Sequence, residues 1–291
     1  PWNLLFFLIS IFKSFFYLKQ NKIDKIISTG GYMTFPICIA SIFTRSKLFL
    51  YEPNMVLGRS NLFFLKQCKK IFCYSDSIRR FPLKYSNKIE IINPILNKKS
   101  YLLKNDQKKL SDKKVFLIIG GSQGAKFFQT EFKNTLNKLS KRFNLFVYHQ
   151  TSREHFNDLG IFYKQNNITF QLFDFKRNLE NILLKTDFCI TRAGASALAE
   201  LVFFEIPFLA IPFPYSKDDH QLFNAKYYKE NNCCWMIEQK EMPSKNLYEI
   251  ISNILVDKKN LQLKKKAMNK ISSKNTWENN YKIIINTINE N

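Results

Sequence analysis

Acidic residues are scarce in this sequence: 23 Asp and Glu stand against 45 Lys and Arg, which gives a formal net charge of +22. Such a surplus favours an anionic partner, which could be nucleic acid, an acidic membrane surface or a phosphorylated substrate. The lysines do not alternate with aromatic residues around a recognisable RNA- or DNA-binding motif, so we expect no nucleic-acid partner. The heavy use of Lys, Asn, Ile and Phe is also typical of AT-rich coding sequence, so part of the surplus could lack a function.

Metal-ligand patterns are lacking as well. The six cysteines form no CxxC pair and have no histidine at a ligand spacing, which argues against a zinc site or another metal site. They lie in apolar runs such as "DFCITRAG", where a free cysteine behaves as a small core residue. No signal peptide precedes them, so we expect a reducing cytoplasm.

Hydrophobic runs of membrane-spanning length are absent. The N-terminal run Leu4–Leu18 has about 15 residues and contains Lys13, whereas a span needs about 20 apolar residues. As a helix, this segment would confine its polar residues to one narrow stripe, so its apolar face would be wider than a surface helix needs. That face could be buried against a part of the domain that precedes Pro1, or it could insert shallowly into an anionic membrane. For the second case we expect a membrane patch at Phe7, Phe15, Lys13 and Lys19.

Short apolar runs rich in Ile, Val and Phe alternate with segments of helical period along the whole chain. This order is typical of an α/β protein with parallel sheets and right-handed crossovers. Strands are expected at Lys25–Ser28, Leu48–Tyr51, Ile71–Tyr74, Ile89–Ile92, Val115–Ile119, Leu145–Tyr148, Thr169–Leu172, Phe188–Ile190, Phe208–Ile211 and Cys234–Ile237. Because so many strands exceed one doubly wound sheet, we predict two α/β domains, 1–96 and 97–273, with a C-terminal helix in 274–291 that packs back on the first domain.

Glycine is scarce, with 8 residues in the chain, and most of them follow predicted strands. These are Gly30 and Gly31 after one strand, Gly120, Gly121 and Gly124 after another, and Gly194 after a third. In parallel α/β sheets ligands bind at this edge, where strands lead into helix N-termini. The turn "GGSQGAK" is neither a Walker loop nor a GxGxxG fingerprint. Its free N–H groups, the Ser122 hydroxyl and the helix dipole could hold a phosphate, or it could be a tight structural turn.

Glu200 lies in an otherwise apolar helix, where a carboxylate is costly unless it meets a partner. A ribose diol is one such partner, because two hydroxyl donors match two carboxylate oxygens. A solvated helix face or a nearby lysine would also account for Glu200. Together with the glycine turn upstream and "DDHQ" downstream, a sugar nucleotide is the better interpretation.

Two further polar groups have structural explanations. His149 ends an apolar strand, and we expect it to make a structural hydrogen bond rather than to act as a base. Asp218 and Asp219 precede a predicted helix and are expected to cap its N-terminus. His220 stands next to Gln221 and is not a convincing base.

Eight segments resemble the MurG family of bacterial glycosyltransferases, in family order across essentially the whole chain. They are "STGGYMTFP", "YEPNMVLGRSN", "IINPI", "IIGGSQGAKFF", "YHQTS", "TRAGASALAEL", "PFLAIPFP" and "DDHQLFNA". The resemblance implies the GT-B architecture, two Rossmann-like domains with a cleft between them. It also implies inverting transfer of GlcNAc from UDP-GlcNAc to lipid I (undecaprenyl-pyrophosphoryl-MurNAc-pentapeptide), which gives lipid II for peptidoglycan, without metal or cofactor. Such an enzyme is expected at the cytoplasmic face of the bacterial inner membrane, as a peripheral protein.

The resemblance also implies which residues bind UDP-GlcNAc. They are Asn54, Ser122, Gln123, Gly124, Ala195, Ser196, Ala197, Glu200 and Gln221. Ser122 and the glycine turn would take the diphosphate, Glu200 the ribose hydroxyls and Gln221 the GlcNAc hydroxyls. The acceptor-side loop would contain Gly30, Gly31 and Tyr32.

Three departures from the family pattern change what is expected. The chain begins after the family's first glycine loop, which carries a His proposed to handle the acceptor proton, so the catalytic base is unidentified and we expect the chain alone to be inactive. Leu96 stands where the family usually has Arg, and "GGYMTFP" lacks a further Gly before Pro36. Two alternatives therefore stay open: a non-catalytic UDP-sugar-binding protein, and a GT-B transferase for another lipid acceptor.

Overall fold

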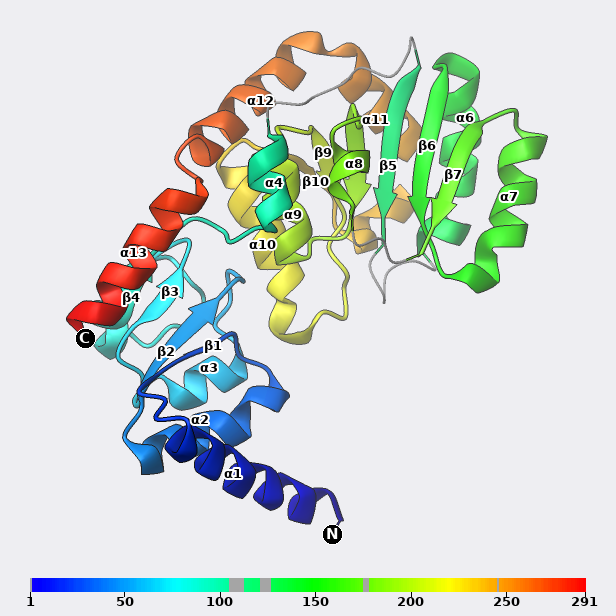
Figure 1. Cartoon of the computed structure of the whole chain (residues 1–291). Coiled ribbons are helices and arrows are strands. Elements are labelled where there is room, and N and C mark those ends of the chain that lie inside the picture. The colour runs from blue at the N-terminus through cyan, green and yellow to red at the C-terminus, as the bar shows by residue number, and fades with distance from the viewer. Residues whose placement is uncertain (1, 105–112, 121–126, 175–177, 245) are drawn as a thin grey trace. The chain divides into compact units, whose positions relative to one another are not determined.

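The computed structural model describes residues 2–104, 113–120, 127–174, 178–244 and 246–291. The chain divides into two α/β units, each with its own parallel sheet. Unit 1 contains Pro1–Ile95 and Asn275–Asn291, and unit 2 contains Leu96–Lys274. Figure 1 labels the elements of both units.

Unit 1 has a four-stranded parallel sheet in the order β1-β2-β3-β4. The strands are β1 (Lys25–Ser28), β2 (Lys47–Glu52), β3 (Ile71–Cys73) and β4 (Ile89–Ile91). Its helices are α1 (Trp2–Gln20), α2 (Phe35–Thr44), α3 (Arg59–Phe64) and α13 (Trp277–Glu290), with short 3-10 turns at Tyr32–Thr34 and Leu83–Lys88. Alternate residues of β2 enter different cores: Leu48 and Leu50 join one cluster, and Phe49 packs with Ile288 of α13 in another.

Unit 2 has a six-stranded parallel sheet in the order β10-β9-β8-β5-β6-β7. The strands are β5 (Lys114–Ile119), β6 (Leu145–Gln150), β7 (Thr169–Phe173), β8 (Phe188–Thr191), β9 (Phe208–Ala210) and β10 (Trp235–Met236). The helices are α4 (Lys98–Leu103), α6 (Lys133–Arg142), α7 (Phe156–Gln165), α8 (Glu180–Leu183), α9 (Ala195–Phe203), α10 (His220–Glu230), α11 (Leu247–Val256) and α12 (Lys258–Ser272). Shorter 3-10 turns lie at Arg153–His155, Lys217–Asp219 and Gln239–Ser244.

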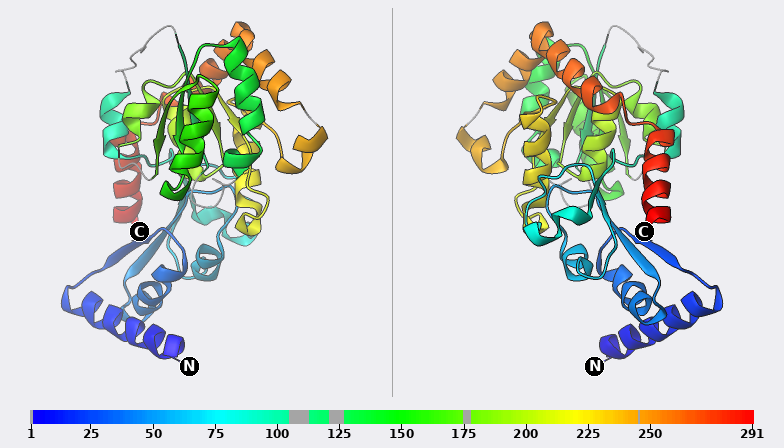
Figure 2. Two further views of the ribbon diagram at one scale, coloured as in Figure 1. Left: turned by 90° about the vertical axis from the view of Figure 1, so that its right-hand side faces the viewer. Right: turned by 90° about the vertical axis from the view of Figure 1, so that its left-hand side faces the viewer.

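Both faces of the unit 2 sheet are buried, which is why its strands read as continuous apolar runs. Along β5, Val115 and Leu117 point into one core cluster, whereas Phe116 and Ile118 point into the other. Figure 2 shows helices on both sides of this sheet. The strand order changes direction at β5, which pairs with β6 on one side and with β8 on the other, so the switch point of the sheet lies between β5 and β8.

The predicted fold class is confirmed, and each predicted strand is present with ends that differ by at most two residues. The largest difference is at β6, which continues through the polar residues His149 and Gln150. It does so because both residues still pair with β7. Among the described residues, no helix has the length and apolar character that a membrane span requires.

Candidate nucleotide-sugar site

Two glycine turns begin at neighbouring strand ends of the unit 2 sheet, at its switch point. Strands β5 and β8 run in parallel with Ile119 opposite Thr191, and the Arg192 amide donates to the Ile119 carbonyl at 3.0 Å. Gly120 follows β5, and Gly194 follows β8 two residues beyond Arg192. The predicted ligands Ser122, Gln123 and Gly124 belong to the first turn and lie outside the described residues. The structure thus brings the two turns to the strand edge where α/β sheets bind ligands.

The N-terminus of helix α9 lies at the second turn and has no side-chain cap hydrogen bond from the described residues. Gly194 is its N-cap residue, and no acidic residue occupies its first turn, which contains Ala195, Ser196 and Ala197. A Cβ added to Gly194 would meet no described atom within 4 Å. Unpaired N–H groups and the positive end of the helix dipole can receive a phosphate there.

Glu200 lies further along α9, and no described residue is its polar partner. Its carboxylate is half-buried and makes no hydrogen bond or ion pair with the residues that the structure describes, so no described lysine accounts for it. Burial raises the pKa of Glu200 to about 7, and the charge of nearby Glu180 adds to the shift. A group that donates two hydroxyl hydrogen bonds to the carboxylate could compensate the missing solvation.

Glu180 was missed from the sequence. It begins α8, is 3% exposed, and its Oε2 atom is buried without a hydrogen-bond partner. Its surroundings, "NLENILL", look like an ordinary amphipathic segment, so only the fold shows that two carboxylates lie near each other.

Gln221 of α10 has a fixed amide orientation. Its Oε1 atom accepts from the Ala193 amide at 3.1 Å and from the Phe213 amide at 3.0 Å. The Nε2 group therefore points away from these amides and has no hydrogen bond to a described residue. Three residues on, the buried Asn224 donates through Nδ2 to the Ala193 carbonyl at 3.2 Å. Both polar groups of the Ala193 peptide are thus held from α10, and Gln221 remains available only as a donor.

The capping prediction is wrong for Asp219. Asp219 occupies the N-cap position of α10 but makes no side-chain cap hydrogen bond. Asp218 and Asp219 both have left-handed backbone conformations, with φ of 54° and 55°, which turns the Asp219 side chain away from the helix N–H groups. Instead the Ser216 hydroxyl accepts from the Gln221 amide at 3.4 Å. His220 makes a hydrogen bond through Nδ1 to the Lys217 carbonyl at 2.7 Å.

His149 has the structural role that the sequence predicted. Its Nδ1 atom makes a hydrogen bond of 2.8 Å to the Tyr163 hydroxyl, and its ring is fully buried. Burial lowers the pKa of His149 to about 3, so the ring is neutral at physiological pH. A neutral buried imidazole of this kind holds β6 to α7.

Asn54 in unit 1 belongs to a loop that is organised by Glu52. Glu52 is 2% exposed, and its Oε1 atom accepts from the backbone and side-chain amides of Asn54 at 3.1 and 3.0 Å. Its Oε2 atom accepts from the Gly58 amide at 2.8 Å and from Asn61 Nδ2 at 2.9 Å. These donors compensate the buried charge. The sequence drew attention to Asn54 alone, although Glu52 and Asn61 are needed to hold it.

The predicted acceptor-side loop lies against the same group. Gly30 and Gly31 have φ of 79° and 86°, a conformation that favours glycine. A Cβ at Gly30 would come within 3.0 Å of Asn61 Oδ1, so glycine is also required for space. Tyr32 is 68% exposed. The two predicted segments of unit 1 are therefore neighbours.

Comparison with known proteins identifies the family. Residues 115–280 match the glycosyltransferase family 28 C-terminal domain, and residues 1–73 match the family 28 N-terminal domain. The UDP-N-acetylglucosamine--N-acetylmuramyl-(pentapeptide) pyrophosphoryl-undecaprenol N-acetylglucosamine transferase of Pelagibacter ubique (strain HTCC1062) is 47% identical over 291 residues, which are 100% of this chain and 82% of that protein. The transferase of the same name from Rickettsia bellii (strain RML369-C) is 31% identical, over 94% of this chain and 82% of that protein. The chain belongs to the MurG family.

Solved structures confirm the GT-B architecture of this MurG family member. Acinetobacter baumannii MurG superposes with a TM-score of 0.73 at 22% identity, over 99% of this chain and 80% of that one. The Neisseria meningitidis UDP-GlcNAc 2-epimerase bound to UDP-GlcNAc superposes with a TM-score of 0.67 at 13% identity, over 98% and 81% of the two chains. At these identities the likeness concerns the fold alone.

Leu96, which replaces the Arg expected from the MurG resemblance, is a core residue of unit 2. It is 7% exposed and packs in the same cluster as Val115 and Phe203, and its amide donates to the Tyr101 hydroxyl at 3.3 Å. The position therefore contributes packing and no cation in this MurG family member.

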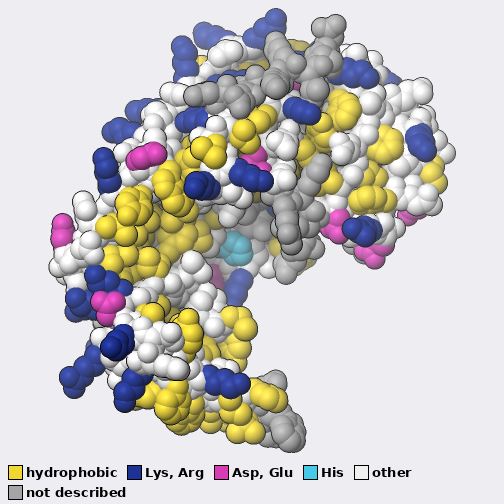
Figure 3. All heavy atoms as spheres, in the orientation of Figure 1, with side chains coloured by type: hydrophobic (Ala, Val, Ile, Leu, Met, Phe, Trp, Pro, Cys, Tyr) yellow, Lys and Arg dark blue, Asp and Glu magenta, His cyan; other side chains and the backbone are white. Residues whose placement is uncertain are grey.

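Helix α1 exposes a different apolar face from the one predicted as a membrane patch. Phe7 is half-buried and stacks on Tyr32 at 5.8 Å between ring centroids, and the half-buried Phe15 packs against the unit 1 core. These two rings share a helix face with the buried Leu18. The exposed apolar side chains of α1 are Leu4, Leu5, Phe6, Leu8, Ile9, Phe12, Phe16 and Tyr17, at 39% to 65% exposure. Figure 3 shows hydrophobic side chains gathered over α1.

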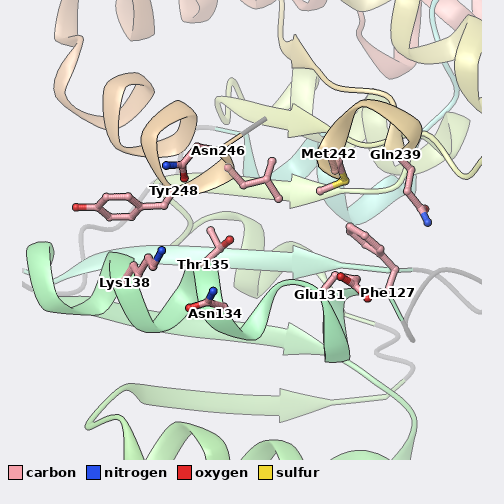
Figure 4. Close-up of a pocket in the computed structure, with 10 residues that line it drawn as sticks. Phe127, Glu131, Asn134, Thr135, Lys138, Gln239, Met242, Asn246 and Tyr248 are labelled. Atoms are coloured by element: carbon pink, nitrogen blue, oxygen red, sulfur yellow. The ribbon is translucent and has the colours of Figure 1, made fainter. Parts of the chain in front are cut away.

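A separate hollow of about 530 Å³ lies in unit 2 between α6, the 3-10 segment Gln239–Ser244 and α11 (Figure 4). The charged side chains of Glu131 and Lys138 line it together with Asn246 and Tyr248. None of the predicted donor-site residues that the structure describes lines it. Gln239 and Phe127 lie at one end, where Phe127 follows the first glycine turn.

Proposed function

We propose that this protein is an inverting glycosyltransferase that moves GlcNAc from UDP-GlcNAc to the muramyl sugar of lipid I, which gives lipid II for peptidoglycan synthesis. The relatives' names describe this transfer, and the chain is 47% identical to one of them over its whole length. The structural observation that supports it most is the unpaired carboxylate of Glu200, which lies in the helix that follows a glycine turn at the switch point of a parallel sheet.

The donor would bind partly through groups that have no partner among the described residues, Glu200 and the Gln221 Nε2 group. Glu200 would accept hydrogen bonds from the two ribose hydroxyls. The N–H groups at the N-terminus of α9 and in the Ser122 turn would donate to the diphosphate. The Gln221 Nε2 group would donate to a GlcNAc hydroxyl, because its Oε1 atom is already used. We assign Asn54 of unit 1 to the donor sugar on the MurG resemblance.

The transfer would be one displacement at the anomeric carbon. The bond from the muramyl O4 to C1 of GlcNAc forms while the bond from C1 to the diphosphate oxygen breaks, so UDP leaves with the electron pair. The hydroxyl proton passes to a base, which the described residues do not identify. N–H groups at the turns and the dipole of α9 would stabilise the negative charge that develops on UDP.

We also propose a peripheral position at the cytoplasmic face of the inner membrane, where a polyprenyl acceptor lies. The exposed apolar face of α1 supports this position, since an isolated surface helix does not need so many exposed aromatic and aliphatic side chains. Lys13 and Lys19 are exposed on the same helix and would meet anionic headgroups.

The experiment that tests the function is UDP release by the complete protein with UDP-GlcNAc and lipid I. We expect release only when both substrates are present, and an unchanged rate in EDTA. Binding of UDP-GlcNAc without release in the presence of lipid I would instead identify a non-catalytic UDP-sugar-binding protein.

A further inference from the structure

Arg192 is a buried cation without an acidic partner. Its residue exposure is 4%, and it makes no ion pair with any residue that the structure describes. The guanidinium donates only to neutral oxygens: the carbonyls of Ile211 and Pro212, both at 3.2 Å from Nη1, and Gln239 Oε1 at 2.9 Å from Nη2. Its Nε group is buried and has no hydrogen-bond partner among the residues that the structure describes. A buried charge of this kind is costly and normally occurs with a carboxylate or phosphate.

Three aromatic rings pack against the guanidinium and do not neutralise its charge. Its central carbon lies 4.8 Å from the ring centroid of Phe127 and 5.4 Å from those of Phe128 and Phe213. Cation–π contacts stabilise a positive charge without neutralising it. Burial lowers the pKa of Arg192 to about 10, so the group remains protonated at neutral pH.

The contacts of Arg192 join the segments to which the donor diphosphate is assigned. Phe127 and Phe128 directly follow the first glycine turn, and Arg192 itself precedes the Gly194 turn by two residues. The carbonyls of Ile211 and Pro212 belong to the loop after β9, whose next amide, that of Phe213, is held by Gln221. One side chain thus connects the residues after the first glycine turn with the exits of β8 and β9.

We infer that Arg192 is a positioning residue of the donor site, which joins the Gly194 turn, the residues after the first glycine turn and the loop after β9, and whose charge, uncompensated by any described residue, favours the diphosphate. The inference rests on the proposed function, because it assigns the negative charge to bound UDP-GlcNAc and to the leaving UDP. A fixed positive charge at this place stabilises the charge that develops as the bond from C1 to the diphosphate breaks.

The sharpest test is Gln239→Glu, which adds a charge without changing the size of the side chain. A carboxylate at this position still accepts from Nη2 but pairs with the guanidinium and cancels its charge. We expect the UDP affinity to fall about fivefold or more. Cancelling a unit positive charge roughly 10 Å from the bound diphosphate has that effect at an effective dielectric constant of about 20 to 40. The affinity for uridine, which carries no phosphate, should not change. Asn246→Asp is the matched control, because it makes the same chemical change elsewhere in the hollow that Gln239 lines.

A second pair of variants measures the same effect without relying on Gln239. The ratio of UDP affinity to uridine affinity should be nearly unchanged in Arg192→Lys and should fall in Arg192→Gln. Partial unfolding of a variant would lower both affinities equally and so would not change this ratio. Equal changes for UDP and uridine in Gln239→Glu, or equal ratios in the two Arg192 variants, would overturn the inference. Failure of the wild type to bind UDP at all would instead contradict the proposed function.

Discussion

At the scale of single residues, the account depends on side chains whose polar atoms lack partners. Glu200 is the clearest case, because its carboxylate is half-buried beside Glu180 and no described residue neutralises it. The sequence indicated Glu200 through its apolar surroundings. It could not indicate Glu180 or Arg192, because their significance depends on which residues meet them in three dimensions.

Glu200→Gln should weaken UDP binding. The amide keeps the size of the side chain but loses the charge that two ribose hydroxyls would share, so the loss should be about 1.5–3 kcal/mol, the range for hydrogen bonds to charged groups. Isothermal titration with UDP measures it, and circular dichroism checks the fold. Unchanged affinity in a folded variant would remove Glu200 from the site.

The affinity for UDP-GlcNAc should depend on pH through Glu200. The pKa of this group is raised to about 7 in the free protein, and the diol binds its charged form, so binding must release a proton below pH 7. We expect the affinity to rise by up to about tenfold per pH unit as pH increases toward 7, and to level off above it. UDP-GlcNAc is the suitable probe, because its diphosphate diester does not titrate in this range. The dependence should vanish in Glu200→Gln, and a similar slope in that variant would assign the titration to another group.

Gln221→Glu should weaken binding of the sugar nucleotide more than binding of the nucleotide alone. A glutamate can still accept from the amides of Ala193 and Phe213, but it has no N–H group to donate to a GlcNAc hydroxyl. The added charge weakens UDP and UDP-GlcNAc alike, whereas the lost hydrogen bond weakens only UDP-GlcNAc, so the KM for UDP-GlcNAc should rise about tenfold more than the Kd for UDP. Equal losses for both ligands would show that Gln221 makes no contact with the sugar.

At the scale of elements, strands were predictable because their signal is local. Strands β5 and β8 are buried on both faces of a parallel sheet. Such strands appear in the sequence as continuous apolar runs, which can be recognised without the structure. The cap of α10 was not predictable in the same way. Asp219 stands at the right position, but its left-handed backbone prevents the cap, and only the geometry of the loop after β9 shows this.

Helix α1 should attach the protein to anionic vesicles through its exposed face. Phe12 and Phe16 are 64% and 63% exposed, so Phe12→Ser with Phe16→Ser removes apolar area from the surface without creating a cavity. We expect flotation of the complete protein with anionic vesicles, reduced by these changes and by salt. Leu102→Ser is the control, because Leu102 of α4 in unit 2 is 73% exposed and also apolar.

Two results of the flotation experiment would contradict this attachment. One is equal flotation of the α1 variant and the wild type, which would assign the contact to another surface. The other is failure of the wild type to float with any vesicle, which would leave the apolar face of α1 as a surface for protein packing.

At the scale of the whole molecule, the positive net charge agrees with a reaction in which both the donor and the acceptor substrate are anionic. UDP-GlcNAc and lipid I each carry a diphosphate, and the chain has a formal net charge of +22. The family and the fold class could be predicted from the sequence because the eight matching segments occur in family order. The partners of individual polar atoms could not, since residues such as Glu52 and Asn61 meet only after the loop between β2 and α3 has folded.

The rate of GlcNAc transfer to lipid I by the wild type, Glu200→Gln and Glu230→Gln is the most direct test of the central claim. Glu230 is exposed at the end of α10, so its replacement controls for the loss of one negative charge. The account predicts that Glu230→Gln stays within about twofold of the wild type and that kcat/KM of Glu200→Gln falls about 10- to 150-fold, the equivalent of 1.5–3 kcal/mol. Equal rates for all three proteins, or no transfer by the complete wild-type protein, would contradict it.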